Sequence, residues 1–167
     1  MKNRLIYLLP FLFLFFACTK ERSANPENVM EALINDEYWS GASSAEWQKY
    51  QDVLVIQGVR CLSDQTPCFD SEDLTIAIHG FTGQTGVYDI ESPSYGLYRN
   101  WFGGDMTHFC GQTDSTSFTG QISLTVFDTL SKTVECTFHY KAKDEADRVY
   151  IINNGRFYSN QLAIFEQ

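Results

Sequence analysis

Apolar and polar residues alternate with a period of two along much of this chain. The alternation is clearest in residues 120–127 and 133–140, where every second side chain is apolar and the intervening ones are mostly polar. Such a pattern is typical of strands with one buried and one solvated face. The mostly polar residues 128–132 separate the two segments, so this region is the most clearly predicted β-hairpin of the chain.

Other short segments, rich in Val, Ile and aromatic residues, also have the composition of strands. They are residues 52–59, 74–79, 149–152, 156–158 and 162–165. The tripeptide Asn153-Asn154-Gly155 either makes a tight turn between two strands or places a bulge at its glycine within a single strand. The last segment is expected to close the sheet.

Two segments are compatible with more than one structure. Pro26 and Glu27 are typical of a helix start, whereas residues 29–34 also read as a strand that turns at Asn35-Asp36. Ser43 and Glu46 have the spacing of a capping box, which predicts a short helix or a single helical turn after them.

Taken together, these patterns predict an all-β fold. We expect an antiparallel β-sandwich or a partly closed β-barrel of about eight to ten strands, formed by a single domain at residues 29–167. The domain is large enough for a core of its own, because 44% of the chain is hydrophobic and 15% is aromatic.

The first 17 residues resemble an export signal. Lys2 and Arg4 precede an uncharged apolar run at 5–17, which at about 1.5 Å per residue is too short to favour a membrane-spanning helix. The run ends in Ala17-Cys18, which resembles a bacterial lipobox, where the cysteine is acylated after cleavage. We therefore predict a signal peptide at 1–17, a lipidated Cys18 and a tether at 18–28. An ordinary signal peptide is the alternative.

The charge of the chain limits its partners. There are 12 Lys and Arg against 21 Asp and Glu, and removal of the leader with Lys2 and Arg4 leaves a balance of −11. No basic stripe is available to neutralise phosphates, so a nucleic-acid partner is excluded. The expected partners are the membrane, through the lipid at the N-terminus, and an envelope protein or polymer.

The remaining four cysteines form an even set, as expected for an oxidising compartment. We predict the disulfides Cys61–Cys68 and Cys110–Cys136, and therefore no free thiol in the mature domain. A zinc site built from His108, Cys110, Cys136 and His139 is the alternative. It is disfavoured because a strand places Cys136 and His139 on opposite faces.

Three segments together resemble a known family. They are residues 32–39 (ALINDEYW), the tripeptide 86–88 (GVY), and residues 134–157, which begin with VECTF and end with VYIINNGRF. The chain resembles, over residues 29–159, small cell-envelope lipoproteins of Gram-negative bacteria in an all-β family of uncharacterised function. The resemblance implies an anchored envelope protein, and it implies no catalytic residues.

Candidate binding residues lie in two clusters. Asp64, Asp70, Glu72 and Asp73 surround the predicted Cys61–Cys68 loop and could offer oxygen ligands to calcium, although a solvated acidic loop is the simpler interpretation and we predict no metal. The second cluster is aromatic and contains Tyr95, Tyr98, Trp101 and Phe102. Flat rings of this kind can stack on sugars or line the mouth of a barrel, while core packing is the simpler role.

Residues for catalysis are not evident. His79, His108 and His139 are candidates for a triad with Ser115 or Ser117 and an aspartate, but the sequence contains no Gly-x-Ser-x-Gly motif. We therefore expect a non-enzymatic, lipid-anchored envelope protein without a cofactor, which contacts another protein or an envelope polymer. The alternative is a small-ligand or glycan-binding barrel that uses the aromatic cluster, and a hydrolase is a third hypothesis.

Overall fold

The computed structural model describes residues 28–64, 68–103, 105–111 and 120–166, with the backbone alone for 107–111. These residues form eleven β-strands and one short 3-10 helix. In chain order they are β1 (Val29–Ile34), β2 (Glu37–Gln48), η1 (Lys49–Gln51), β3 (Val53–Cys61), β4 (Ser71–His79), β5 (Gly86–Ile90), β6 (Tyr95–Phe102), β7 (Asp105–Gly111), β8 (Gly120–Asp128), β9 (Thr133–Asp144), β10 (Val149–Ser159) and β11 (Leu162–Phe165).

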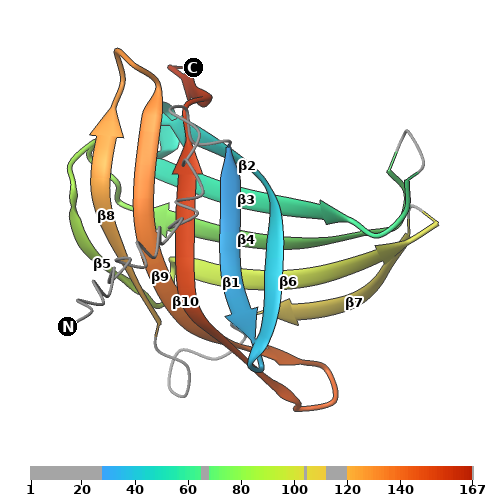
Figure 1. Cartoon of the computed structure of the whole chain (residues 1–167). Helices are drawn as coiled ribbons and strands as arrows, with labels where there is room; N and C mark the ends of the chain where they lie inside the picture. Colours follow the sequence, from blue (N-terminus) through green and yellow to red (C-terminus); the bar gives the residue numbers. More distant parts are fainter. Residues whose placement is uncertain (1–27, 65–67, 104, 112–119, 167) are drawn as a thin grey trace, which may run out of the picture.

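All eleven strands belong to one sheet, in the order β10-β1-β2-β3-β4-β6-β7-β9-β8-β5, with β11 beside β2. The pairs are antiparallel except β11 with β2. The sheet curls strongly, so that β9, β10 and β1 cross in front of β3 and β4 (Figure 1). β7 meets β9 in only two register pairs, and the sheet is not closed into a barrel. The all-β prediction is confirmed, as a sandwich or partly open barrel, with slightly more strands than expected.

The predicted hairpin at 120–140 is confirmed as β8 and β9. Its turn is held by the carboxylate of Asp128, whose Oδ1 accepts hydrogen bonds from the N–H groups of Leu130 and Ser131 at 2.8 and 3.3 Å. The hydroxyl of Ser131 donates to the other carboxylate oxygen at 2.8 Å. A short polar connection therefore closes this hairpin through its own side chains.

The two ambiguous segments are both strands. Asn35 and Asp36 have φ angles of 50° and 69°, as the two-residue turn between β1 and β2 requires. Strand β2 continues through Ser43 and Glu46, so the predicted capping box does not form, and a single 3-10 turn follows later at η1. The reason is tertiary, because the hydroxyl of Ser43 donates to the carbonyl of Tyr158 in β10 instead of accepting a hydrogen bond from a helical N–H group.

The tripeptide 153–155 makes a bulge rather than a turn. β10 is continuous from Val149 to Ser159, and its register against β9 shifts between Ile152 and Gly155. The predicted last strand, 162–165, is confirmed as β11.

The core lies between the two crossing layers. Its largest fully buried side chains are Trp39, Tyr140, Phe81, Met30, Leu54, Ile56, Leu74, Ile76, Ile78, Ile90, Ile122 and Leu124. Trp39 and Met30 pack directly on Gly58 of β3, where a Cβ atom would lie 2.6 Å from the Met30 Cβ and 2.9 Å from the Trp39 ring. A glycine is therefore required at this position so that the layers can approach.

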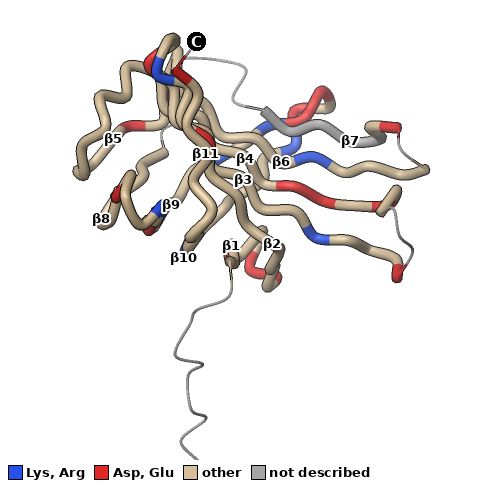
Figure 2. Tube along the Cα trace, turned by 90° about the horizontal axis from the view of Figure 1, so that it is seen from above, with Lys and Arg blue, Asp and Glu red and all other residues tan. Residues whose placement is uncertain are grey.

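The ends of β3, β4, β6 and β7 project beyond the core. In Figure 1 they extend to the right, and in Figure 2 they form the right-hand side of the molecule. We call this projection the arm and define it by the register pairs Val59↔Asp73, Asp73↔Arg99 and Phe102↔Asp105 and the residues beyond them. The N–H group of Gly103 donates to Asp70 Oδ1 at 2.8 Å and thereby links the two hairpins of the arm.

Candidate functional site

A groove of about 850 Å³ crosses the outer face of the sheet over β2, β1, β10, β9 and β8. Its polar side chains alternate along the strands with buried core residues, so the groove lies on the face opposite the core. Five of them are neutral hydrogen-bonding groups, namely Gln121, Ser123, Thr137, Asn153 and Asn154. We call this feature the outer groove.

The bulge in β10 shapes the centre of the outer groove. Asn154 has a φ angle of 51°, and the register of β10 shifts against both of its neighbours, β9 and β1. Gly155 follows and is buried against the ring of Phe138, where a Cβ atom would collide with that ring. The bulge therefore leaves two amide side chains, those of Asn153 and Asn154, exposed to solvent, while position 155 faces the core.

Tyr38 stands at the β2 side of the outer groove with 63% of its surface exposed. Its hydroxyl donates to Glu31 Oε1 at 2.7 Å. This bond to a carboxylate raises the pKa of Tyr38, so its hydroxyl loses its proton at a higher pH than that of an ordinary tyrosine. The ring is held at its tip while its surface remains open to solvent.

The charged groups of the outer groove balance one another. Glu31 and Arg156 are register partners on β1 and β10, and His139 lies beyond them on β9. Among the described residues that line the groove, Glu31 is the single carboxylate. The groove therefore offers many neutral polar groups and little net charge.

The predicted aromatic cluster is dispersed along β6. Tyr98 is buried in the core, and its ring lies 5.7 Å from that of Tyr150. Tyr95 is the first residue of β6, and its ring lies 6.1 Å from that of His79. Trp101 is half-buried and donates to Asp73 Oδ1 at 2.9 Å, whereas Phe102 is 69% exposed on the arm. The four residues therefore do not form one stacking surface.

The acidic cluster is also divided. Glu72 shares the core-side face of β4 with Leu74, while its neighbour Asp73 points to the opposite face. Asp70 bonds to Gly103, and Asp64 is exposed. Acidic residues are spread over the turns and the arm (Figure 2), and within the described residues no group of three His, Cys, Asp or Glu is placed to hold a metal ion.

Glu72 and Asp73 each pair with a different arginine. Glu72 Oε2 accepts hydrogen bonds from Arg60 Nε at 3.0 Å and from Trp39 Nε1 at 3.1 Å. Asp73 is 2% exposed and accepts from Arg99 Nε at 3.0 Å. Gln57 and Thr75 donate to the same Asp73 oxygen, both at 3.2 Å. These carboxylates are occupied within the protein and have a structural role.

The histidines considered and disfavoured as members of a triad are not brought together in the described part of the chain. His79 ends β4, whereas His139 lies in the outer groove on β9. The side chain of His108 and the residues Ser115 and Ser117 lie outside the described residues. His139 is thus a groove residue whose signal in the sequence was its place on the polar face of a strand.

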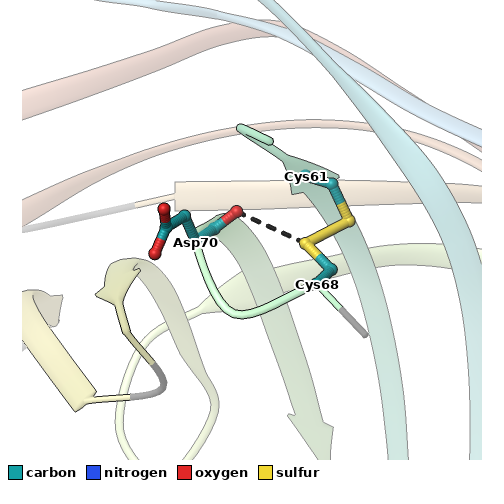
Figure 3. The surroundings of a disulfide bond; sticks show 3 residues. All are labelled: Cys61, Cys68 and Asp70. Atoms are coloured by element: carbon teal, nitrogen blue, oxygen red, sulfur yellow. Dashed lines mark hydrogen bonds between the residues drawn. A yellow bond between two sulfur atoms is a disulfide. The ribbon is translucent and has the colours of Figure 1, made fainter. Parts of the chain in front are cut away.

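The first predicted disulfide is present and the second is not. Cys61 and Cys68 are bonded, with Cα atoms 5.9 Å apart, and Cys68 Sγ also contacts the carbonyl of Asp70 at 3.3 Å (Figure 3). Cys136 is a free, buried thiol. The prediction of Cys110–Cys136, and with it that of no free thiol, was therefore wrong.

Strand register explains this error. The register partner of Cys110 on β9 is Asp144, which is eight residues along the strand from Cys136. At about 3.3 Å per residue this is about 26 Å, whereas a disulfide requires Cα atoms closer than about 7 Å. Burial raises the pKa of the Cys136 thiol, so the residue packs as an apolar group. Its inward direction, opposite to that of His139, agrees with the argument against a zinc site.

The leader at 1–17, Cys18 and most of the tether lie outside the described residues. Within the described ranges, no helix has the length and apolar character needed to cross a membrane.

Comparisons with models of protein families, with curated proteins and with solved structures give no match to this chain. The groove is therefore interpreted from its own chemistry. Sequence reasoning missed Tyr38 and the two asparagines as site residues, although each lies on the outer, polar side of a strand or at a bulge signal.

Proposed function

We propose that this protein is a lipid-anchored, non-enzymatic binding module of the cell envelope, and that the outer groove holds its partner. The observation that carries the proposal is the groove itself, which combines about 850 Å³ of open volume with hydrogen-bonding side chains from five strands. Ligand sites commonly occupy about 300–1,000 Å³ and present a few polar groups in defined positions. The lipid at Cys18 would keep this surface next to other envelope components.

A binding role fits the groove better than catalysis. Its one described carboxylate, Glu31, already accepts a hydrogen bond from the hydroxyl of Tyr38, and sugar hydrolysis generally requires two carboxyl groups flanking the bond that is cleaved. The alternative of a small ligand inside the barrel has less support, because Tyr98 and its neighbours fill the interior with a packed core.

The anchor is tested by replacing Cys18. We expect the full-length Cys18→Ala variant to leave the membrane fraction of cells, while the wild type stays in it. Recovery of the variant in the membrane fraction would contradict lipidation at this residue.

The groove is tested with a matched pair of variants. Thr137 lies in the groove on β9, whereas Ser44 is an exposed residue of β2 outside the groove lining. We expect Thr137→Arg to lose the envelope component that wild type and Ser44→Arg retain, as measured by native mass spectrometry after incubation with envelope extract. Both variants add one positive charge, so equal retention by both would exclude the groove as the binding site.

A further inference from the structure

The outer groove has the chemistry of a carbohydrate site, and this inference rests on the function proposed above. We propose that its ligand is a neutral oligosaccharide that lies across the strands, with one sugar ring stacked on Tyr38 and its hydroxyl groups bonded by the amides and hydroxyls of the groove. Four properties of the described residues lead to this ligand class.

The first property is the presentation of Tyr38. Tyrosine provides a large, rigid contact area at a low entropy cost, because it has only two side-chain torsions. Here the hydroxyl bond to Glu31 restricts the ring further, and more than half of its surface stays exposed. A fixed, solvent-exposed ring beside polar groups suits the apolar face of a sugar, which has hydroxyls at its edges.

The second property is the kind of hydrogen-bonding group. Three amides, from Gln121, Asn153 and Asn154, and two hydroxyls, from Ser123 and Thr137, line the groove. Amides and hydroxyls each both donate and accept, as sugar hydroxyls do. A ligand with many hydroxyls can therefore pair with most of the lining, whereas an apolar ligand would displace water from these groups without replacing its hydrogen bonds.

The third property is the extent of the site. From Tyr38 on β2 to Gln121 on β8 the groove crosses four strand spacings, which at about 4.8 Å each amount to about 19 Å. This length suits a chain of sugars rather than a single ring. All five strands have neighbours on both sides, so none offers the free edge that an extended peptide would need for strand addition.

The fourth property is charge. The groove holds Glu31 and Arg156 in balance, while the mature chain carries a net charge of −11. A polyanion would be repelled by the whole molecule without a compensating basic patch in the groove. The charge distribution therefore favours a neutral saccharide.

The decisive experiment uses the full chain and two treatments of envelope extract. Periodate destroys sugars with adjacent hydroxyls, whereas protease digestion removes proteins. We expect the groove-dependent component detected by native mass spectrometry to persist after protease digestion and to disappear after periodate treatment. Loss after protease digestion alone would overturn the carbohydrate inference and leave the proposed binding function intact. Binding that is unaffected by Thr137→Arg would overturn both.

The orientation of the ligand is tested by a second set of variants. With the isolated component as the probe, we expect Tyr38→Ala to weaken binding by about tenfold, the size expected for loss of a stacked aromatic contact. Tyr38→Phe keeps the ring and should stay within about threefold of wild type. Tyr50→Ala removes another exposed tyrosine, 53% exposed against 63% for Tyr38, from η1 outside the groove, and serves as the control. Equal affinities of Tyr38→Ala and Tyr50→Ala would overturn the stacking arrangement.

Discussion

The arm and the rest of the sheet, which we call the body, use the two faces of a strand differently. In the body, as in β9, inward residues such as Phe138 are buried in the core while outward residues such as Thr137 meet solvent. In the arm, neighbouring residues of β4 carry charges on both faces, because Glu72 pairs with Arg60 on one side and Asp73 pairs with Arg99 on the other. Alternation in hydrophobicity therefore describes the body and not the arm.

The arm also shows why an acidic run in a sequence is a weak indicator of a metal site. Glu72 and Asp73 are adjacent in the chain, yet the thickness of the sheet separates their carboxylates. Each is neutralised by an arginine from a neighbouring strand and receives a hydrogen bond from a tryptophan, Trp39 or Trp101. Strand pairing supplies these partners, and they convert an apparent ligand cluster into two structural networks.

The largest effect is expected at the junction of the two regions. Trp39 is 1% exposed, packs on Gly58 in the body and donates to Glu72 in the arm. We expect Trp39→Ala to lower the free energy of unfolding by about 3–5 kcal/mol, because it leaves a large cavity. Urea denaturation measures the change. Trp101→Ala, at a half-buried tryptophan of the arm, should cost less, and an equal loss would contradict the division into body and arm.

The next largest effect is expected within the arm. Asp73→Ala leaves the donors of Arg99 and Trp101 without their acceptor, and we expect a loss of about 2–3 kcal/mol in the free energy of unfolding. The exposed Asp64 is the control, since Asp64→Ala should change stability by less than about 0.5 kcal/mol. Similar urea midpoints for the two variants would show that the buried network does not stabilise the arm.

The disulfide of the arm should contribute a similar or smaller amount. Cys61 and Cys68 are seven residues apart, and closing so short a loop is worth about 2.5 kcal/mol on the chain-entropy model. We expect the double variant Cys61→Ser/Cys68→Ser to unfold at lower urea than wild type. A reductant should shift the midpoint of the wild type and leave that of the double variant unchanged. A wild type insensitive to reductant would contradict a stabilising bridge.

The smallest effect is expected at the β8–β9 turn of the body. Hydrogen bonds from the Ser131 hydroxyl and from the N–H groups of Leu130 and Ser131 hold the pKa of Asp128 below its usual value. The contribution of this carboxylate to stability is therefore complete above the pKa that Asp128 has in the unfolded chain. It is lost as the pH falls through the lower pKa that Asp128 has in the folded chain. We expect the stability difference between wild type and Asp128→Asn to shrink on acidification below about pH 4. A constant difference would show that the charge of Asp128 does not matter.

Sequence reasoning succeeded where the information was local. The hairpin of β8 and β9, the strand β11 and the bridge Cys61–Cys68 depend on residues close together in the chain, and all three were predicted. The pairing of Cys110 with Cys136 failed because it depends on the register of β7 against β9. The capping box at Ser43 failed because a distant carbonyl, that of Tyr158, takes the hydroxyl.

The candidate site was the least predictable feature for the same reason. Tyr38 and Glu31 come from one hairpin, but Arg156, His139 and Gln121 join them only when β10, β9 and β8 are laid beside β1. The sequence showed that each lies on the polar side of a strand and could not show that these sides adjoin.

The sequence by itself determined that this chain is an all-β domain, where most of its strands lie and that it is strongly acidic, because alternation, turn residues and charge can be read locally. Only the tertiary structure decided which strands pair, which cysteine stays free and which polar side chains share the outer groove. Those properties depend on register between segments distant in the chain, and register is set by the packing of the whole core.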